Sequence, residues 1–532
     1  MRVLFVASEC YPLIKTGGLA DVVGALPQAL GRLGAEVRVL LPNYPEVAGA
    51  LGGTRVVGRF RERGGDVTLL AGEASGLDVI ALDAPHLFDR PGSPYHMPDG
   101  QDWPDNHVRF ATLSGIAARI GCEGVAGWRP DVVHAHDWQA GLAPFYIRLA
   151  TVPCARTVFT IHNMAYQGVV PTTELDTLGI PSRFYTADGM EYWGALSLLK
   201  SGIVYSDRVT TVSPTYAQEL RTGEFGMGLE GAVSARAKDF AGILNGIDDT
   251  VWNPRTDRLI PATYSPRDLS GKAADKAALQ AAFGLDVDPS RPVFTVISRL
   301  AYQKGLDILL AVLPELIERG GQLVLLGSGD PDLQRAYMDA AAGHPGRVGV
   351  RIGYDESLSH LAQAGADAII IPSRFEPCGL TQLYALAYGT LPIVARTGGL
   401  ADTVIDANDA ALARNIGTGF VFYPVNADRL RFAVERAIAL WYGAPEVWRR
   451  LQVNAMAQPV GWHASAERYL DLYRSLPGEG AGAPAQPEAP AEKSAAPKKP
   501  ARPRAATAAP KAKPATAARK SRKSPTSGKN GG

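Results

Sequence analysis

The sequence has 532 residues, which is too long for one ordinary domain and allows two large hydrophobic cores. Its hydrophobic fraction of 46% and charged fraction of 20% are typical of globular proteins. No run reaches the roughly 20 apolar residues of a membrane-spanning helix, so the composition argues against an integral membrane protein.

The formal net charge of +1 hides an uneven distribution of charge along the chain. Residues 478–532 hold 12 Lys and Arg against 3 Asp and Glu, so this tail carries +9 and residues 1–477 carry −8. The tail is rich in Ala, Pro and Lys, and it cannot bury enough apolar surface to offset the entropy of ordering. We expect a disordered tail, whose charge leaves two roles open: weak binding of polyanions and simple solubilisation.

Four cysteines lie far apart and show no C-x-x-C spacing: Cys10, Cys122, Cys154 and Cys378. We expect reduced thiols in a cytoplasmic protein, with neither a disulfide framework nor a zinc site. The apolar start of the chain is short and soon turns polar, so we interpret it as a buried strand and not as a signal peptide.

The first part of the chain, up to about residue 245, alternates short β-branched runs with longer segments of helical periodicity. The strand candidates are 3–7, 37–41, 67–70, 79–82, 132–134, 157–161 and 208–212. The helix candidates are 22–33, 108–120 and 139–149. This alternation predicts a mostly parallel sheet with right-handed crossovers.

A turn-rich segment at 245–254 marks a boundary, after which the same pattern begins again. The strand candidates are 293–298, 322–326, 348–352, 368–371 and 391–395. The helix candidates are 307–318, 332–341, 357–363, 381–388 and 427–441. We therefore predict the α/β class, with two doubly wound domains that face a cleft, where ligands bind beyond the carboxyl ends of the strands.

One short motif occurs once in each half of the chain. Lys15-Thr-Gly-Gly-Leu-Ala-Asp21 follows the first strand, and Arg396-Thr-Gly-Gly-Leu-Ala-Asp402 follows a strand near the other end. Each copy joins a cation to two glycines at the start of a helix, where backbone N–H groups and the helix dipole favour an anion. The repeat predicts a phosphorylated ligand held between two domains.

Two further loops of the second half carry groups that suit a phosphorylated sugar. Arg299 and Lys304 follow a strand and could converge on one anion. Gly379 precedes a helix whose first N–H groups suit a diphosphate, and Glu376, just before it, could accept hydrogen bonds from sugar hydroxyls. For Cys378, a buried structural role is an equally good interpretation.

Polar residues also end two strands of the first half. His136 and Asp137 follow one strand, and His162 and Asn163 follow the next. We expect His134 and His136 on opposite faces of their strand, where they cannot chelate one metal, and no other cluster has metal-ligand spacing. We predict no catalytic metal and no cofactor.

Taken together, these motifs resemble those of the glycogen and starch synthases, in particular the bacterial branch that uses ADP-glucose. The likeness rests on Lys15-Thr-Gly-Gly-Leu, His136-Asp-Trp, His162-Asn, Ser298-Arg, Gln303-Lys-Gly and Phe375-Glu-Pro-Cys-Gly-Leu. It runs over about residues 1–476 and implies a GT-B fold of two Rossmann-like domains, 1–245 and 246–462. A helix at 463–477 would cross back to the first domain, before the tail at 478–532.

The resemblance implies transfer of glucose from ADP-glucose to the non-reducing end of an α-1,4-glucan, with retained anomeric configuration. His162 and Asp137 would contact the glucose, Glu376 would lie beside it, and Arg299 and Lys304 would neutralise the diphosphate. The implied donor-binding residues are Lys15, Gly17, Gly18, Asp21, Asn163, Asn245, Tyr354, Cys378, Gly379, Leu380 and Thr381. Tyr95 and His96, in a long polar loop, are acceptor candidates.

One position narrows the resemblance. Many retaining GT-B enzymes carry a second glutamate eight residues after the first, and this sequence has Tyr384 there. That favours the glycogen and starch synthase branch. The alternatives are a transferase that uses UDP-glucose or another acceptor, and an inactive relative that binds glucan as a scaffold.

Overall fold

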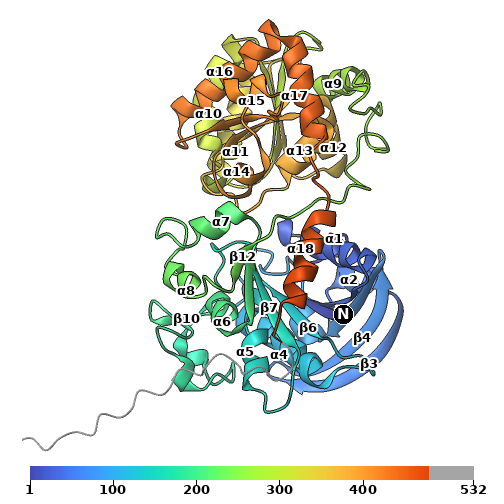
Figure 1. Ribbon diagram of the computed structural model, residues 1–532, viewed down its shortest axis with the longest axis vertical. Coiled ribbons are helices and arrows are strands. Elements are labelled where there is room, and N and C mark those ends of the chain that lie inside the picture. Colours follow the sequence, from blue (N-terminus) through green and yellow to red (C-terminus); the bar gives the residue numbers. More distant parts are fainter. Residues whose placement is uncertain (478–532) are drawn as a thin grey trace, which may run out of the picture. The chain divides into compact units, whose positions relative to one another are not determined.

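The computed structural model describes residues 1–477, shown in colour in Figure 1. The tail predicted at 478–532 lies outside these residues. Within the described part of the chain, no helix has the length and apolar character needed to cross a bilayer.

The first domain is built on a nine-stranded sheet in the order β12-β11-β7-β6-β1-β2-β5-β4-β3. Its strands are β1 (Arg2–Val6), β2 (Glu36–Pro42), β3 (Gly52–Glu62), β4 (Gly65–Ala74), β5 (Leu77–Asp83), β6 (Val132–His136), β7 (Arg156–Ile161), β11 (Arg208–Thr211) and β12 (Phe240–Gly242). Only the β3–β4 and β4–β5 pairs of this sheet are antiparallel. The strand candidates omit β3 and β12, because β3 is a largely exposed edge strand without a buried apolar run and β12 has only three residues.

Two groups of helices accompany this sheet. Helix α1 (Gly18–Arg32) packs on α18 (His463–Arg474), whereas α4 (Asn106–Glu123), α5 (Ala143–Leu149) and α6 (Leu198–Tyr205) pack in succession. The connection through α1 runs toward one edge of the sheet, and those through α4, α5 and α6 run toward the other. With right-handed crossovers the two groups therefore cover opposite faces, as in a doubly wound fold.

Smaller elements complete the first domain. They are α2 (Pro45–Ala50), α3 (Pro85–Phe88), α7 (Pro214–Glu219), α8 (Glu230–Ala235) and a small antiparallel sheet of β8 (Val169–Val170), β10 (Ala195–Ser197) and β9 (Glu191–Tyr192). The 3₁₀ turns are η1 (Trp138–Ala140), η2 (Thr172–Glu174) and η3 (Ser182–Phe184).

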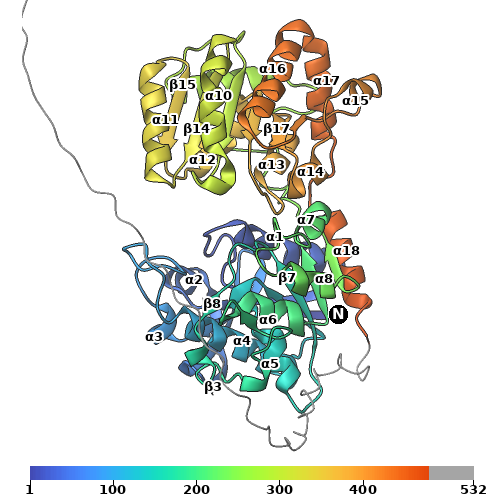
Figure 2. The same cartoon turned by 90° about the vertical axis from the view of Figure 1, so that its left-hand side faces the viewer.

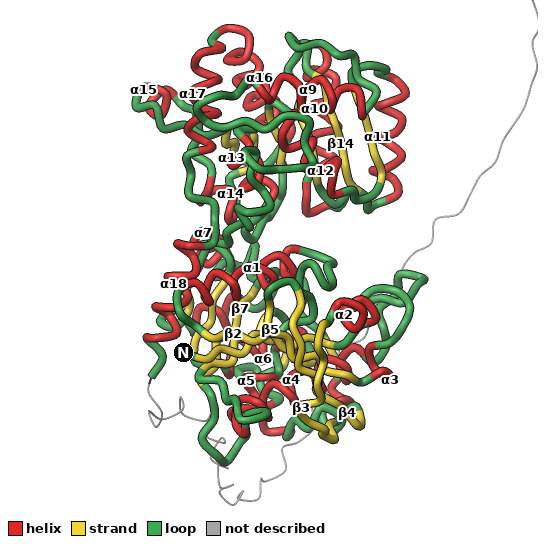
Figure 3. Tube along the Cα trace, turned by 90° about the vertical axis from the view of Figure 1, so that its right-hand side faces the viewer, coloured by secondary structure: helices red, strands yellow, loops and turns green. Residues whose placement is uncertain are grey.

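The second domain has a six-stranded, fully parallel sheet in the order β15-β14-β13-β16-β17-β18. Its strands are β13 (Val293–Ile297), β14 (Gln322–Gly327), β15 (Val348–Ile352), β16 (Ala368–Ile371), β17 (Leu391–Ala395) and β18 (Phe420–Phe422). Figure 3 shows these strands in yellow among red helices. The predicted strands match β13 to β17, and only the three-residue β18 is missing from the prediction.

The helices of this domain lie on both faces of its sheet. They are α9 (Gly271–Ala282), α10 (Leu306–Glu318), α11 (Pro331–Gly343), α12 (Glu356–Gly365), α13 (Thr381–Tyr388), α14 (Gly398–Thr403), α15 (Asp409–Ala413), α16 (Ala427–Gly443) and α17 (Pro445–Met456). Figure 1 shows the α10–α16 pair and the α9–α12 pair on opposite sides. Helix α10 packs on β14 and α11 on β15 (Figure 2). The predicted class, two doubly wound α/β domains, is confirmed.

The hydrophobic cores follow the same division. One large cluster joins the first sheet to Tyr469, Leu470 and Tyr473 of α18, and a second cluster contains only residues from Ile247 to Ala455. The last described helix is thus buried against the first domain. The bounds given above for the four segments of the chain stay a prediction.

The expectation of four reduced thiols is wrong for one pair, because Cys122 and Cys154 form a disulfide. Helix α4 ends beside the start of β7, where the Ala155 N–H donates to the Gly121 carbonyl at 2.9 Å. This contact brings together two cysteines that are 32 residues apart in the sequence, a pairing that no spacing rule reveals. The argument for a cytoplasmic protein from unpaired cysteines is lost with it.

Candidate active site

A partly buried ion pair joins the loop between β16 and α13 to the turn that follows β13. Lys304 Nζ lies 2.6 Å from Glu376 Oε2, and the Ser373 hydroxyl donates to the same oxygen at 2.8 Å. Lys304 ends the 3₁₀ turn η4 (Tyr302–Lys304), and Gly305 follows at φ +64°. A Cβ on Gly305 would lie 2.1 Å from the Pro372 carbonyl oxygen, so only glycine lets the two loops approach this closely. The structure thus brings Lys304 and Glu376 together.

The start of α13 offers free backbone donors. Gly379 has φ +71°, and the Gln382 side chain donates to the carbonyls of Cys378 and Gly379 at 2.9 and 3.2 Å. These bonds fix the turn that leads into the helix. No side chain among residues 1–477 caps this helix, so its first N–H groups remain available to an anion.

Arg299 lies beyond the end of β13 and is exposed. Its guanidinium donates to the hydroxyl of Tyr166, a residue of the first domain, at 3.4 Å. The neighbouring Arg374 is fixed differently, by a bidentate pair with Asp307 at 2.7 Å. Of these two arginines, Arg299 is therefore the one whose guanidinium is accessible to a ligand.

The first copy of the repeated motif has an unforeseen partner. The buried Glu9 carboxylate accepts the N–H of Thr16 and, at 2.9 Å, that of Gly17. In this structure the Gly17 N–H thus faces the chain's own carboxylate, and a role of Gly17 in donor binding stays a prediction. Glu9 comes shortly after β1, which ends at Val6, and an acidic residue just beyond the carboxyl end of a buried strand is the sequence signal that could have identified it.

Lys15 and Gly18 of this copy face the second domain. Lys15 Nζ pairs with Asp21 at 2.8 Å and lies 6.0 Å from the centre of the Tyr354 ring. A Cβ on Gly18 would touch Leu380 at 3.8 Å, which places the motif beside the start of α13. Burial raises the pKa of Asp21, and the neighbouring Lys15 ammonium counteracts that rise.

The second copy packs behind the Glu376 loop. A Cβ on Gly398, at φ +43°, would lie 1.9 Å from the Glu376 carbonyl oxygen, and one on Gly399 would lie 2.2 Å from that of Cys378. The Gly398 N–H donates to Glu219 of the first domain at 3.0 Å. These glycines serve close backbone packing, and their helix start is occupied by the chain's own carboxylate.

Three histidines lie side by side at the ends of β6 and β7. The rings of His134 and His136 are 4.2 Å apart, and His136 Nδ1 lies 2.9 Å from His162 Nε2. The expectation of opposite faces for His134 and His136 is wrong, because residues two apart on a strand point to the same side. Within residues 1–477 no three His, Cys, Asp or Glu side chains form a metal-ligand group, and the absence of a metal stays a prediction.

Asp137 organises the end of β7. It adopts φ +55°, which is rare for a residue other than glycine, and its carboxylate accepts the N–H of His162 at 2.7 Å and of Asn163 at 3.4 Å. Burial raises the pKa of Asp137 to about 7 and lowers the pKa of His162 to about 3. His162 is therefore a neutral imidazole at physiological pH.

The two acceptor candidates are engaged within the first domain. The Tyr95 hydroxyl donates to Glu9 and lies 2.7 Å from Ser8 Oγ. His96 contacts Ser93 Oγ at 3.1 Å through Nδ1 and Asp102 at 3.2 Å through Nε2. Tyr95 thus helps to hold the carboxylate that anchors the first glycine motif, and a contact with the acceptor stays a prediction for both.

Three predicted donor contacts differ in exposure. Tyr354 is largely exposed, and its hydroxyl donates to Glu356. Cys378 is buried in the core of the first domain, and burial raises the pKa of its thiol to about 12. Asn245 is buried, and its side-chain oxygen has no hydrogen-bond partner within the described residues. The structure favours the buried, structural interpretation of Cys378.

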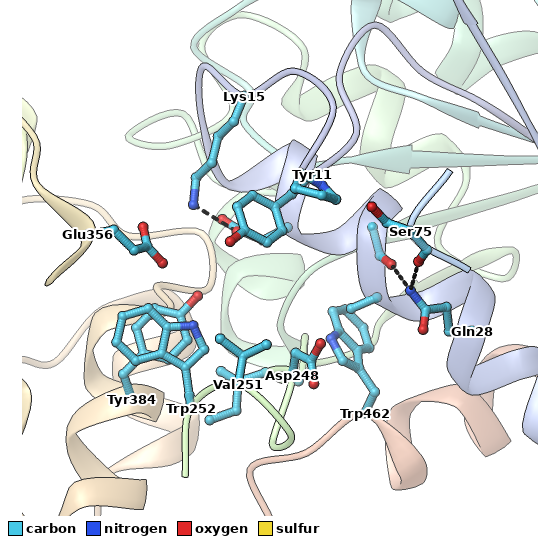
Figure 4. Close-up of a pocket in the computed structure, with 16 residues that line it drawn as sticks. Tyr11, Lys15, Gln28, Ser75, Asp248, Val251, Trp252, Glu356, Tyr384 and Trp462 are labelled. Atoms are coloured by element: carbon cyan, nitrogen blue, oxygen red, sulfur yellow. Dashed lines mark hydrogen bonds and ion pairs between the residues drawn. The ribbon is translucent and has the colours of Figure 1, made fainter. Parts of the chain in front are cut away.

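A cavity of about 260 Å³ lies beside Lys15 (Figure 4). Tyr11, Lys15 and Asp21 line it from the first domain, and Trp252, Glu356 and Tyr384 line it from the second. Figure 4 shows the Trp252 and Tyr384 rings stacked face to face, with centroids 3.8 Å apart. Tyr384, at the position of the missing second glutamate, is therefore an aromatic wall of this cavity.

Matches to two family models cover most of the described chain. Residues 2–235 match the starch synthase catalytic domain, and residues 280–454 match the glycosyl transferases of group 1. With the two doubly wound domains, these matches define a glycosyltransferase of the GT-B fold.

Curated relatives narrow this class. The chain is 54% identical over 479 residues to the glycogen synthase of Roseobacter denitrificans, covering 90% of this chain and all of the relative. It is 53% identical over 478 residues to the glycogen synthase of Edwardsiella ictaluri, with the same coverage. The chain belongs to the glycogen and starch synthase family.

Solved structures agree with this assignment. The catalytic domain of starch synthase IV from Arabidopsis thaliana, bound to ADP and acarbose, superposes with a TM-score of 0.81 at 36% identity. The match covers 89% of this chain and 98% of that one. The sucrose-phosphate synthase of Thermosynechococcus elongatus, at 19% identity and a TM-score of 0.55, shares the fold alone.

Proposed function

We propose that this protein transfers glucose from ADP-glucose to the non-reducing end of an α-1,4-glucan, with retention of configuration. The observation that carries the proposal is that three features meet: the Lys304–Glu376 ion pair, the uncapped start of α13, and the Lys15 motif, whose Gly18 lies beside Leu380. The family supplies the reaction class. The ADP and acarbose bound in the starch synthase IV structure suggest the ligands.

The roles of the cations follow from the chemistry of the leaving group. Cleavage of the bond between the anomeric carbon and phosphate leaves ADP with developing negative charge. Arg299, Lys304 and Lys15 stabilise that charge, and the N–H groups of Leu380 and Thr381 bind its phosphates. Each such preorganised donor is typically worth about 2.7–4 kcal/mol of the barrier.

The sugar side of the site is built from groups of both domains. Glu376 accepts hydrogen bonds from glucose hydroxyls, and Lys304 and Ser373 keep its carboxylate oriented. The neutral His162 accepts or donates one hydrogen bond at the sugar, and Asp137 fixes its backbone. Asp21, Asn163, Asn245 and Tyr354 complete the donor site, with Tyr354 as the aromatic face for the base.

Retention follows from attack on the face that the leaving group departs from. The donor-site carboxylates Glu376 and Asp21 are each held by a lysine, so neither is free to form a covalent glucosyl intermediate. The departing phosphate accepts the proton of the acceptor hydroxyl as the new bond forms. Trapping of a covalent glucosyl-enzyme would contradict this mechanism.

The test is an assay with two donors. We expect the purified protein to release ADP from ADP-glucose in the presence of glycogen, with much slower release of UDP from UDP-glucose. Lys304→Ala lowers turnover by roughly 10²–10³ if the cation stabilises the leaving group. Equal use of both donors would contradict the donor assignment. No release from either donor would favour a glucan-binding scaffold.

We also propose, on the count of 12 cations against 3 anions, that residues 478–532 bind polyanions in a salt-dependent manner. Truncation at Pro477 should abolish DNA binding at low salt and leave transferase activity unchanged. Retained DNA binding after truncation would contradict this role.

A cytoplasmic site of action also stays a prediction, which fractionation of cells can test.

A further inference from the structure

His136 is a fully buried histidine whose ring has a single hydrogen-bond partner. It is the last residue of β6, and none of its surface is exposed. Its Nδ1 lies 2.9 Å from His162 Nε2, whereas its own Nε2 has no hydrogen-bond partner within residues 1–477. An unpaired polar atom in the interior opposes folding, so packing alone gives no reason for a histidine at this position. The group that its ring contacts is the ring of His162.

The orientation of the His136 ring is fixed by aromatic neighbours. The ring stacks on Phe5, with ring centres 5.0 Å apart, and lies against the ring of His134, with centres 4.2 Å apart. His134 is held at both of its nitrogens, by the Tyr473 hydroxyl at 2.7 Å and by the Thr160 hydroxyl at 2.6 Å. These contacts therefore fix the direction in which Nδ1 of His136 points.

The hydrogen bond between the two rings requires one donor and one acceptor. Burial lowers the pKa of His136 and that of His162, so both rings are neutral at physiological pH and each carries a single N–H. With its proton on Nε2, His136 would bury an N–H donor that has no partner among the described residues, which is rare in proteins. With its proton on Nδ1, His136 donates to His162, and only a lone pair stays unpaired.

The proton of His162 must then lie on its other nitrogen, Nδ1. Because Nε2 of this ring accepts the bond from His136, the single N–H of the neutral imidazole is left at Nδ1. In the described part of the chain no group bonds to this Nδ1, and the protein does not enclose it. His162 follows the last residue of β7, at the carboxyl edge of the sheet, where ligands bind in open α/β folds. Its ring thus offers a ligand one donor and no acceptor.

We propose that His136 is a positioning residue, which holds His162 in the Nδ1–H tautomer so that His162 donates a hydrogen bond to an oxygen of the transferred glucose. A donor complements the carboxylate of Glu376, which can only accept. A sugar hydroxyl that gives its proton to a carboxylate still has a lone pair for an imidazole N–H. The other tautomer of His162 would oppose that lone pair with its own. The inference rests on the proposed function, since it concerns the donor sugar of that reaction.

Nitrogen NMR of the full-length protein, with its histidine rings labelled with ¹⁵N, tests the tautomer directly. The signals of His162 are those that disappear in His162→Gln. In the unmodified protein we expect a pyrrole-type shift for Nδ1 of His162 and a pyridine-type shift for Nε2. In His136→Leu, which removes the donor, the proton should move at least partly to Nε2. Tyr473→Phe, which removes only the hydroxyl beside His134, is the control and should leave the His162 signals as they are.

Two amide variants separate the hydrogen bond from the volume of the side chain. His136→Asn places its amide nitrogen where Nδ1 lies, and His136→Gln reaches the place of Nε2 instead. We expect kcat with ADP-glucose and glycogen to stay within about threefold in His136→Asn. It should fall about tenfold in His136→Gln and His136→Leu, the effect of one hydrogen bond of ordinary strength. KM for glycogen should stay the same in all three variants.

A pyridine-type Nδ1 of His162 in the unmodified protein, or equal kcat values for His136→Asn and His136→Gln, would overturn the proposal. If a variant at His136 fails to fold, which its melting temperature shows, the spectrum of the unmodified protein decides by itself. Failure of the proposed function is a different result. It would appear as absence of ADP release by the unmodified protein, whereas the tautomer is measured without any substrate.

Discussion

The two copies of Thr-Gly-Gly-Leu-Ala-Asp have the same residues and opposite surroundings. In the first copy, a Cβ on Gly17 meets no atom within 4 Å, and Lys15 points toward a cavity. In the second copy, Gly398 is wedged against the Glu376 carbonyl, and Arg396 lies over the Tyr423 ring at 5.2 Å. Local sequence sets the same turn into a helix in both. Packing from distant segments decides which copy can receive a ligand and which one supports the loop beside it.

Alanine at the two glycines should give the largest difference between the copies. Gly398→Ala places a methyl group against backbone at positive φ, so we expect a loss of about 2–5 kcal/mol in the free energy of unfolding. Gly17→Ala, at φ −151° with open space, should change it by less than about 0.5 kcal/mol. Urea denaturation of both variants measures this, and similar losses would contradict the difference in packing.

Replacing the carboxylates that occupy the two helix starts should give a smaller difference between the copies. Glu9→Gln weakens hydrogen bonds to Thr16, Gly17 and Tyr95 in a buried place, and we expect a cost of about 1–3 kcal/mol and a higher KM for the donor. Glu219→Gln, at the second copy, should cost about 0.5–1.5 kcal/mol and leave KM for the donor unchanged. Equal donor KM values for both variants would show that Glu9 does not position the first motif.

A third difference concerns pH, and it arises at His360, whose partners Trp252 and Glu356 line the cavity beside Lys15. Burial opposes the charge of His360, but the hydrogen bond to Asp257 at 2.7 Å and the Glu356 carboxylate at 3.6 Å raise its pKa to about 9, and its ring stacks on Trp252 at 3.8 Å. The native state therefore holds more protons than the unfolded state, whose histidine has a pKa of about 6.5. This stabilisation is complete below pH 6.5 and is lost as pH rises through 9.

Replacing His360 tests whether this histidine causes the pH dependence of stability. His360→Gln should flatten the decline of the melting temperature between pH 6.5 and 9, and His463→Gln, at an exposed position of α18, should leave it as it is. An unchanged slope in His360→Gln would assign the decline to other groups.

Much of the fold was predictable from the sequence, because buried parallel strands are continuous apolar runs and the crossover rule then fixes their arrangement. Lys304 and Glu376 were predictable as neighbours for the same reason, since both follow strands whose carboxyl ends meet at one edge. Partners brought in by distant segments were not predictable. Glu9 in the first motif, Glu219 in the second, and the Cys122–Cys154 disulfide each depend on packing that no local pattern encodes.

The most direct test compares kcat/KM for ADP-glucose in Lys15→Ala and Arg396→Ala, with glycogen as acceptor. Lys15 lines the cavity, and Gly18 of the same motif lies beside the start of α13, so we expect loss of the lysine to lower kcat/KM by roughly 10²–10³. Arg396 covers the Tyr423 ring and should matter by less than about threefold, the size of an exposed interaction. Equal losses in the two variants would contradict the assignment of ligand binding to the first copy and of packing to the second.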